Sequence, residues 1–235
     1  MRLVPLAIAA VLIGGLAVTS AWADVEFAPQ ADPWYGNWGA VVFAVLLVSA
    51  FVIGLLRTPG RRPWAELGLA EAYFVALFTE MFGIPLTIYL LGSVLGVQLG
   101  LGMLEGHLWA ALLDHIGLLP LEQGVMLVMT VSDTLILGGL ALMAFGWRQL
   151  WRARGTLVQG GLYGIVRHPQ YAGFLLFVTG FLLQWPTLPT LLLYPILVIA
   201  YYRLARSEER ALRARFGEAY ASYRDRTPML VPRLG

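Results

Sequence analysis

Long apolar stretches separated by short polar segments dominate the chain. Five of them occupy residues 38–56, 72–96, 125–147, 170–186 and 188–205. Each is long enough, or nearly so, to cross a hydrocarbon core about 30 Å thick. Because helices satisfy their own backbone polar groups inside lipid, the pattern predicts an all-α integral membrane protein.

A sixth apolar stretch, residues 3–22, leaves two interpretations open. It follows Arg2 and ends in Ala21-Trp22-Ala23, the small-x-small pattern of a signal-peptide cleavage site. Its length of about 19 residues is long for the apolar region of a signal peptide. We therefore expect five to six transmembrane helices, with residues 1–23 forming either the first of them or a signal peptide.

The charged residues predict the orientation. All 16 basic residues are arginines, and apart from Arg2 they lie in the 57–66 loop, in the 148–169 loop, or from Arg203 onward. The opposite loops, 23–37 and 97–124, contain none. By the positive-inside rule the arginine-rich segments are cytoplasmic. We expect a multi-pass protein of the inner membrane with a cytoplasmic C-terminus, and the pI near 9.0 gives no reason to expect a nucleic-acid partner.

Composition narrows the chemistry. Hydrophobic residues make up 59% of the chain and charged residues 13%, against about 25% charged in soluble domains. The absence of Cys excludes disulfides, a thiolate nucleophile and thiolate metal ligands. Four candidate ligands between spans lack the tight spacing of a metal site, so we expect no metal. They are Glu105, His107, Asp114 and His115.

The loop before the fourth predicted span is the most unusual segment. Four glycines lie between residues 155 and 164, and they allow close approach of a ligand to the backbone. Pro169 can begin a helix whose free N–H groups favour an anion. Arg167 and His168 stand at that helix start, where the helix dipole disfavours cations, so a bound carboxylate would offset the cost. The alternative is an ordinary positive-inside loop.

A charged helix is expected after the last span. The last two spans are joined by a turn with two prolines, at residues 185–189, which predicts a helical hairpin. Beyond it, apolar and basic residues recur at helical spacing on separate faces, which predicts a cytoplasmic interfacial amphipathic helix. The apolar set is Leu212, Phe216, Tyr220 and Tyr223, and the basic set is Arg206, Arg210 and Arg213. Glu208 and Glu209 either pair with arginines on the helix surface or hold an ammonium group.

Two motifs about 40 residues apart resemble those of the isoprenylcysteine carboxyl methyltransferase family, whose wider group includes phospholipid and bacterial thiol methyltransferases. The motifs are Arg167-His168-Pro169-Gln170-Tyr171 and Glu208-Glu209-x-x-Leu212-x-x-x-Phe216-Gly217-x-x-Tyr220. The resemblance covers about residues 155–232. It implies methyl transfer from S-adenosylmethionine (AdoMet), with residues 24–147 as a transmembrane scaffold and residues 148–235 as the AdoMet-binding region.

The resemblance also implies residue roles. Positions expected to bind the cofactor are Leu157, Val158, Tyr163, His168, Pro169, Gln170, Tyr171 and Glu208. Among them, Glu208 would hold the methionine ammonium group. Arg167 and Glu209 would be catalytic or orienting, and Arg203 and Arg206 compete for the substrate-contacting arginine of the family. Members of the family often have a His where this chain has Gly155-Thr156.

Acidic residues inside the predicted spans allow two interpretations. Glu80 and Asp133 lie well within apolar stretches, where an unpaired charge costs about 2.5–3.5 kcal/mol or more. Either they are hydrogen-bonded and stabilise the helix bundle, or Glu80 forms one wall of an acceptor pocket.

Together these observations predict a methyltransferase of the cytoplasmic membrane face that acts on a lipophilic or small acceptor, through a carboxylate, thiol or amine. A thiol or amine must lose a proton, and no obvious base is visible. Two alternatives are a membrane reductase with a nicotinamide cofactor and a non-catalytic assembly or sensing module. The lipid bilayer is the other expected partner, and the oligomeric state is not indicated.

Overall fold

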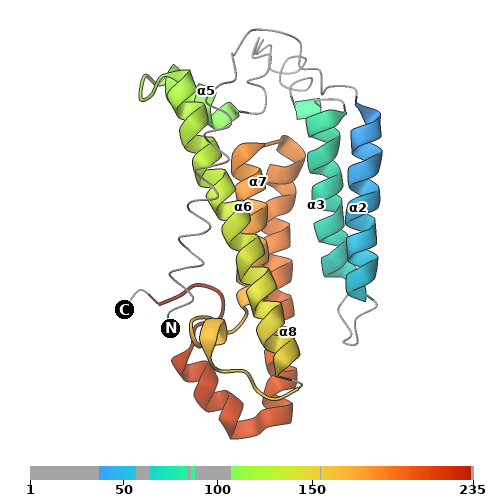
Figure 1. Cartoon of the computed structure of the whole chain (residues 1–235), viewed down its shortest axis with the longest axis vertical. Helices are drawn as coiled ribbons and strands as arrows, with labels where there is room; N and C mark the ends of the chain where they lie inside the picture. The colour runs from blue at the N-terminus through green and yellow to red at the C-terminus, as the bar shows by residue number, and fades with distance from the viewer. Residues whose placement is uncertain (1–36, 57–63, 84–85, 88–106, 154, 234–235) are drawn as a thin grey trace. The chain divides into compact units, whose positions relative to one another are not determined.

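The computed structural model describes residues 37–56, 64–83, 86–87, 107–153 and 155–233. Regular secondary structure within these ranges is entirely helical (Figure 1). The α-helices are α2 (Trp38–Leu56), α3 (Trp64–Phe82), α5 (Leu108–His115), α6 (Leu121–Arg152), α7 (Pro169–Gln184) and α8 (Leu188–Arg226), and a short 3-10 helix, η2, covers Gly161–Gly164. The all-α prediction is confirmed. The 1–23 segment and the arginines at 57, 61 and 62 lie outside the described residues.

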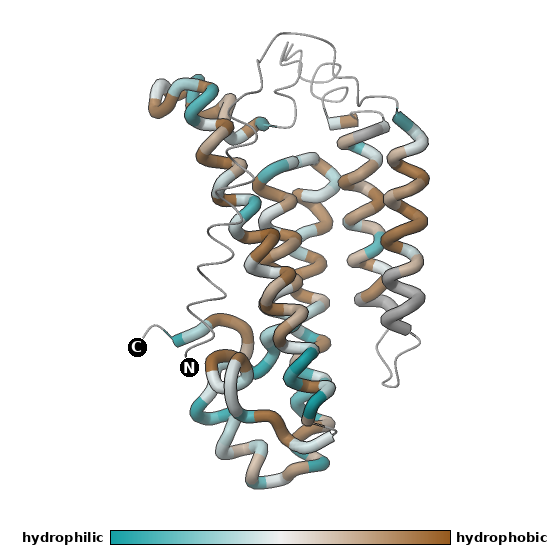
Figure 2. The backbone as a smooth tube through the Cα atoms, in the orientation of Figure 1, coloured by the Kyte–Doolittle hydropathy of each residue, from teal (hydrophilic) through white to brown (hydrophobic). Residues whose placement is uncertain are grey.

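Two of these helices, α6 and α8, are long and apolar enough to cross a membrane. Large apolar side chains are exposed along α2 and α6, as expected for surfaces that face lipid, and Figure 2 shows how far apolar residues extend along both helices. Examples are Leu46, Leu47, Val131, Leu140 and Phe145. The number of spans stays a prediction.

The helix at the second predicted span begins before the apolar stretch does. The sequence pattern predicts a span over residues 72–96, whereas α3 covers Trp64–Phe82. Residues 84–85 and 88–96 of the predicted span lie outside the described residues. Glu71, which immediately precedes the apolar stretch, lies inside the helix, where Ser49 of α2 donates a 2.6 Å hydrogen bond to it. A polar residue at the start of an apolar stretch therefore did not mark the start of the helix, because a neighbouring helix supplies its partner.

The arginine-bearing segment continues the helix of the last predicted span, and its position at the membrane interface stays a prediction. α8 continues without interruption from the hairpin turn through Arg213, and it changes direction only at Gly217, whose φ of 54° and ψ of −125° are non-helical. Such a positive φ favours glycine. The turn carries the last two helical turns, with Tyr220 and Tyr223, back toward the loop before α7, and both tyrosines are buried.

The chain forms two compact units. Among the described residues, one contains 129–153, 155–181 and 201–233, and the other contains 37–56, 64–83, 86–87, 107–128 and 182–200. The predicted division into a transmembrane scaffold, residues 24–147, and an AdoMet-binding region, residues 148–235, is a division by function. It stays a prediction. Within the second unit, α2 and α3 pack side by side (Figure 1).

Glycines let α6 and α7 approach closely within the first unit. A Cβ on Gly139 of α6 would lie 2.5 Å from the carbonyl oxygen of Gly173 in α7, and a Cβ on Gly173 would lie 2.7 Å from the carbonyl oxygen of Gly139. Small residues are the usual means by which membrane helices bring their backbones together. This contact fixes α7 against α6 one turn after Pro169, where α7 begins.

Substitution of Gly139 tests this contact. We expect Gly139→Ala to destabilise the protein by about 1–3 kcal/mol, because the added methyl group must displace α7 backbone. The adjacent Gly138→Ala is the matched control, since a Cβ there meets nothing within 4 Å. Thermal unfolding in detergent would compare the two variants, and equal stabilities would contradict the close packing.

Candidate active site

The loop between α6 and α7 is held by the end of the chain. We call residues 223–229 the C-terminal clamp. The backbone N–H of Arg167 donates to the carbonyl of Pro228 at 2.8 Å, and that of His168 donates to the carbonyl of Met229 at 3.1 Å. The clamp therefore fixes the backbone of the two residues that immediately precede α7.

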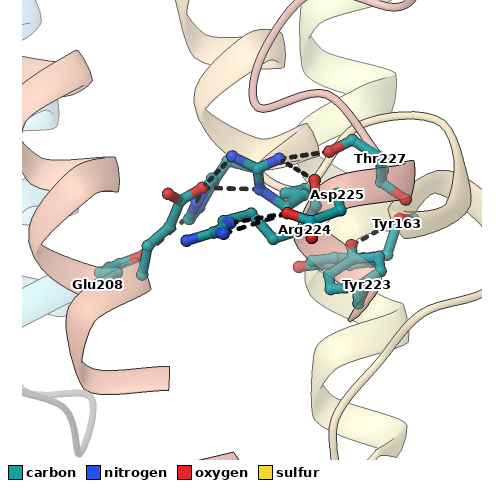
Figure 3. Close-up of polar contacts among 9 residues, drawn as sticks. Tyr163, Glu208, Tyr223, Arg224, Asp225 and Thr227 are labelled. Carbon is teal, nitrogen blue, oxygen red and sulfur yellow. Dashed lines mark hydrogen bonds and ion pairs between the residues drawn. The ribbon is translucent and has the colours of Figure 1, made fainter. Parts of the chain in front are cut away.

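A buried tyrosine adds a further contact. The hydroxyl of Tyr223 donates to the carbonyl oxygen of Tyr163 at 2.6 Å, and both side chains are buried (Figure 3). Tyr163 lies in η2. The preceding residue of η2, Leu162, is tied to α6 by a 3.2 Å hydrogen bond from its N–H to the side chain of Gln149. The loop is thus attached to α6 on one side and to the clamp on the other.

Arg167 forms an ion pair with Glu209 of α8. Its Nε and Nη2 atoms lie 2.7 and 2.6 Å from the Oε1 atom of Glu209, and each side chain is only 10% exposed. Its Nη1 atom donates to the carbonyl oxygens of Arg224, at 2.9 Å, and of Thr227 (Figure 3). The guanidinium group therefore connects the loop, α8 and the C-terminal clamp.

His168 lies between the two consecutive carboxylates of α8. Its Nε2 atom is 3.5 Å from Oε1 of Glu209, and its Nδ1 atom is 3.7 Å from Oε2 of Glu208. The ring is buried and stacks on Tyr171 of α7, with centroids 5.5 Å apart and planes inclined by 13°. Packing against Tyr171 thus holds the ring between the two carboxylates, and its buried Nε2 atom has no hydrogen-bond partner in the structure.

The two carboxylates have different surroundings. Glu209 is buried against Arg167, whereas the side chain of Glu208 is 42% exposed and accepts a 2.5 Å hydrogen bond from the hydroxyl of Tyr171. Both contact the loop or α7, so surface pairing along α8 does not account for either of them. The structure brings together Arg167, His168, Tyr171, Glu208 and Glu209, all named from the sequence motifs.

Burial and charge set the protonation of this cluster. Burial raises the pKa of Glu209. Polar contacts with His168 and Arg167, together with the charge of Arg167, lower it by a larger amount, so the net shift of the pKa is downward. Burial, followed by the nearby charge of Glu209, raises the pKa of Tyr220 to about 12, and burial likewise raises that of Tyr223 to about 12. Near neutral pH, Glu209 is ionised and both phenols keep their protons.

An aromatic residue of α8 that the sequence analysis did not single out completes the cluster. Tyr201 stacks on Phe174 of α7 with centroids 4.6 Å apart, and it meets the ring of Tyr171 edge to face at 5.6 Å. Tyr201 precedes Glu208 by seven residues, which is two helical turns. This spacing on one helix face is the signal that could have identified it.

The other predicted residues lie in varied surroundings. Pro169 is buried, Leu157 and Val158 are half-buried, and Arg203 and Arg206 are exposed. Glu80 belongs to the other compact unit, two residues before the end of α3, where its Oε2 accepts the N–H of Thr87 at 3.1 Å. Within the described part of the chain, no group of three or more His, Asp or Glu residues could hold a metal ion.

Comparison with known proteins identifies the family. Residues 113–219 match the phospholipid methyltransferase family. The chain is 31% identical over 225 residues to methanethiol S-methyltransferase 2 of Bradyrhizobium diazoefficiens, an alignment that covers 83% of this chain and 74% of that protein. It is 31% identical over 77 residues to the protein-S-isoprenylcysteine O-methyltransferase of Schizosaccharomyces pombe, covering 32% of this chain and 33% of that protein. No solved structure matches.

The chain therefore belongs to the phospholipid methyltransferase family of membrane methyltransferases. It is a methyltransferase, and its cofactor is AdoMet. The resemblance seen in the sequence motifs is confirmed, and membership of this family favours methyl transfer over both the reductase and the non-catalytic alternatives.

Replacement of Glu209 tests the ion pair. At pH 7, Glu209→Gln leaves the charge of Arg167 buried without a counter-ion, so we expect a loss of about 3 kcal/mol in the free energy of unfolding. Because the folded-state pKa of Glu209 is depressed, its contribution is present above the unfolded-state pKa of about 4.5 and is lost as the pH falls through the folded-state value. The difference from the unmodified protein should therefore shrink in acid.

The control for this experiment is Asp225→Asn. Asp225 pairs with Arg224 at 3.1 Å, but its side chain is 68% exposed, so its loss should cost less than about 1 kcal/mol. Thermal unfolding in detergent between pH 7 and pH 4 measures both variants. A Glu209→Gln variant no less stable than Asp225→Asn at pH 7 would show that the buried pair does not hold the site together.

Proposed function

We propose that the protein transfers the methyl group of AdoMet to a small thiol at the cytoplasmic face of the inner membrane. The observation that carries this proposal is the extent of the two alignments. The S-methyltransferase aligns with 83% of the chain, including the scaffold helices, whereas the isoprenylcysteine O-methyltransferase aligns with only 32%. Similarity to the thiol enzyme thus extends well beyond the length of the cofactor motifs.

The residues around His168 fit an AdoMet site. The Nε2 atom of Gln170 is buried without a hydrogen-bond partner, which is unusual for a polar atom and suits a donor reserved for a ligand. Glu208 presents a half-exposed carboxylate suited to the methionine ammonium group. Tyr171 offers an aromatic ring of the kind that attracts a cationic sulfur. Leu157, Val158, Tyr163 and Pro169 would complete the cofactor wall.

AdoMet supplies an electrophilic methyl group on a positively charged sulfur. The task of the protein is then to align the acceptor with that methyl group and to exclude water. The buried rings of Tyr171, Phe174 and Tyr201 provide an apolar surface beside the acidic pair. A small neutral thiol needs no charged side chain to bind it. Arg203 and Arg206, which are both exposed, and Glu80 of the scaffold would therefore contribute to binding only if the acceptor were charged.

Arg167 would act through Glu209. Its Nε, Nη1 and Nη2 atoms all contact Glu209 or carbonyl oxygens of the clamp. In this proposal Arg167 is a positioning residue that holds Glu209 and the loop in place, and Glu209 in turn orients His168.

A direct assay tests the proposed function. Purified protein in nanodiscs would be given AdoMet with methanethiol, with a prenylated cysteine carboxylate, or with phosphatidylethanolamine. We expect methylated product from the thiol with kcat/KM at least tenfold above that for either other acceptor. Turnover of the carboxylate or the amine alone would overturn the assignment of a thiol acceptor.

The cofactor role of Glu208 has a separate test. We expect Glu208→Gln to weaken AdoMet binding by about 10- to 100-fold, because a charge-assisted hydrogen bond contributes about 1.5–3 kcal/mol. The matched control is Glu218→Gln, which changes an exposed carboxylate on the same helix and should leave the affinity unchanged. Isothermal calorimetry measures both, and equal affinities would place the ammonium group elsewhere.

A further inference from the structure

A thiol acceptor requires a proton acceptor in the site. The thiolate is the reactive nucleophile, and an ordinary thiol, with a pKa of about 8.5, is mostly protonated at neutral pH. Most ionisable groups of the cluster are unsuited to take this proton. A guanidinium does not lose its proton in proteins, and burial raises the pKa of Tyr220 and Tyr223, so these phenols keep theirs. Polar contacts with His168 and Arg167, and the charge of Arg167, hold the pKa of Glu209 low. Glu208 and His168 remain.

The geometry favours His168 over Glu208. A neutral imidazole has one N–H donor and one nitrogen that accepts. Glu209 is held by Arg167, and its Oε1 atom lies 3.5 Å from Nε2, a buried atom that makes no hydrogen bond in the structure. We assign the proton to Nε2, because this buried carboxylate is the charge that would favour a proton there. Nδ1 is then the accepting atom, and it lies on the side of the half-exposed Glu208, 3.7 Å from its Oε2. A buried carboxylate that orients an imidazole toward a nucleophile is the arrangement of serine hydrolases.

We propose that His168, oriented by Glu209, accepts the proton of the thiol during methyl transfer; this rests on the proposed thiol methyltransferase function. The S–H bond breaks and its proton goes to Nδ1 of His168. A lone pair of the thiol sulfur forms the new bond to the methyl carbon. The bond between that carbon and the sulfonium breaks, and its electron pair stays on the sulfur of S-adenosylhomocysteine. The products are a neutral thioether, S-adenosylhomocysteine and an imidazolium.

The surrounding charges suit this step. Glu209 on one side and Glu208 on the other stabilise the imidazolium that forms, and Arg167 keeps Glu209 in place. On the α7 side, Tyr171 stacks on the imidazole, which fixes the ring plane. Tyr220, beside Glu209 and Arg167, keeps its own proton because its pKa is raised to about 12.

Two acceptors distinguish a base from a structural histidine. An alkyl thiol is mostly protonated at pH 7, whereas 4-nitrothiophenol is already ionised and needs no base. For His168→Phe, which preserves an aromatic ring beside Tyr171, we expect kcat/KM at pH 7 to fall about 100-fold with the alkyl thiol and less than threefold with 4-nitrothiophenol. With the alkyl thiol, the rate of this variant should rise about tenfold per pH unit as the thiol ionises. His168→Gln, as a second variant, should behave alike.

A readout without turnover is available because the chain has no Cys. The S–H stretching band of a bound thiol then has no protein counterpart. In the complex with S-adenosylhomocysteine and ethanethiol, we expect the infrared S–H band to be weakened and shifted to lower frequency in the unmodified protein, where it donates to His168. In His168→Phe the band should keep the frequency of the free thiol. His115→Gln, an exposed histidine on α5, is the control.

The outcomes separate the two proposals. If the unmodified protein methylates no thiol, the proposed function fails. If it does methylate thiols, but both His168 variants lose rate equally with both acceptors, then His168 holds the cofactor or the fold and is not the base. An S–H band that is the same in the unmodified protein and in His168→Phe would lead to the same conclusion.

Discussion

The pairing of Arg167 with Glu209 is the interaction on which the rest of the site depends. One edge of the guanidinium holds a carboxylate of α8, 42 residues away, and Nη1 holds two carbonyls of the C-terminal clamp. Arginine suits this role because its donors form a rigid planar fork that can serve several acceptors at once. Both charges are buried, so removal of either leaves the other without a partner, at greater cost than the loss of a surface pair.

This pairing makes two neighbouring carboxylates unequal. Glu209 is buried, forms an ion pair with Arg167 and lies beside His168. Glu208 is half-exposed and accepts a hydrogen bond from Tyr171. Without the clamp, both would be ordinary acidic residues on a charged helix. The difference in burial and partners is what allows one carboxylate to be proposed for a ligand and the other for positioning.

The first compact unit contains the cluster, and the second contains most of the helices outside the motifs. In that second unit, hydrogen bonds connect Glu80 to Thr87 and Thr87 to the first N–H of α8 at Leu188. These contacts satisfy polar groups that would be costly inside a bilayer. The alignment with methanethiol S-methyltransferase 2 covers 83% of the chain, so the similarity extends beyond the motifs into this second unit.

The sequence by itself determined the helical class, the family and the residues that form the acidic and basic motifs, because apolar length and short-range spacing are local properties. It did not determine where α3 begins, since Glu71 is satisfied by Ser49 of another helix. Nor did it indicate that Arg167 is held by the carbonyls of Arg224 and Thr227. A carbonyl acceptor exists at every residue and leaves no mark in the sequence. Only the turn at Gly217, which folds the end of the chain back onto the loop, decides which carbonyls are used.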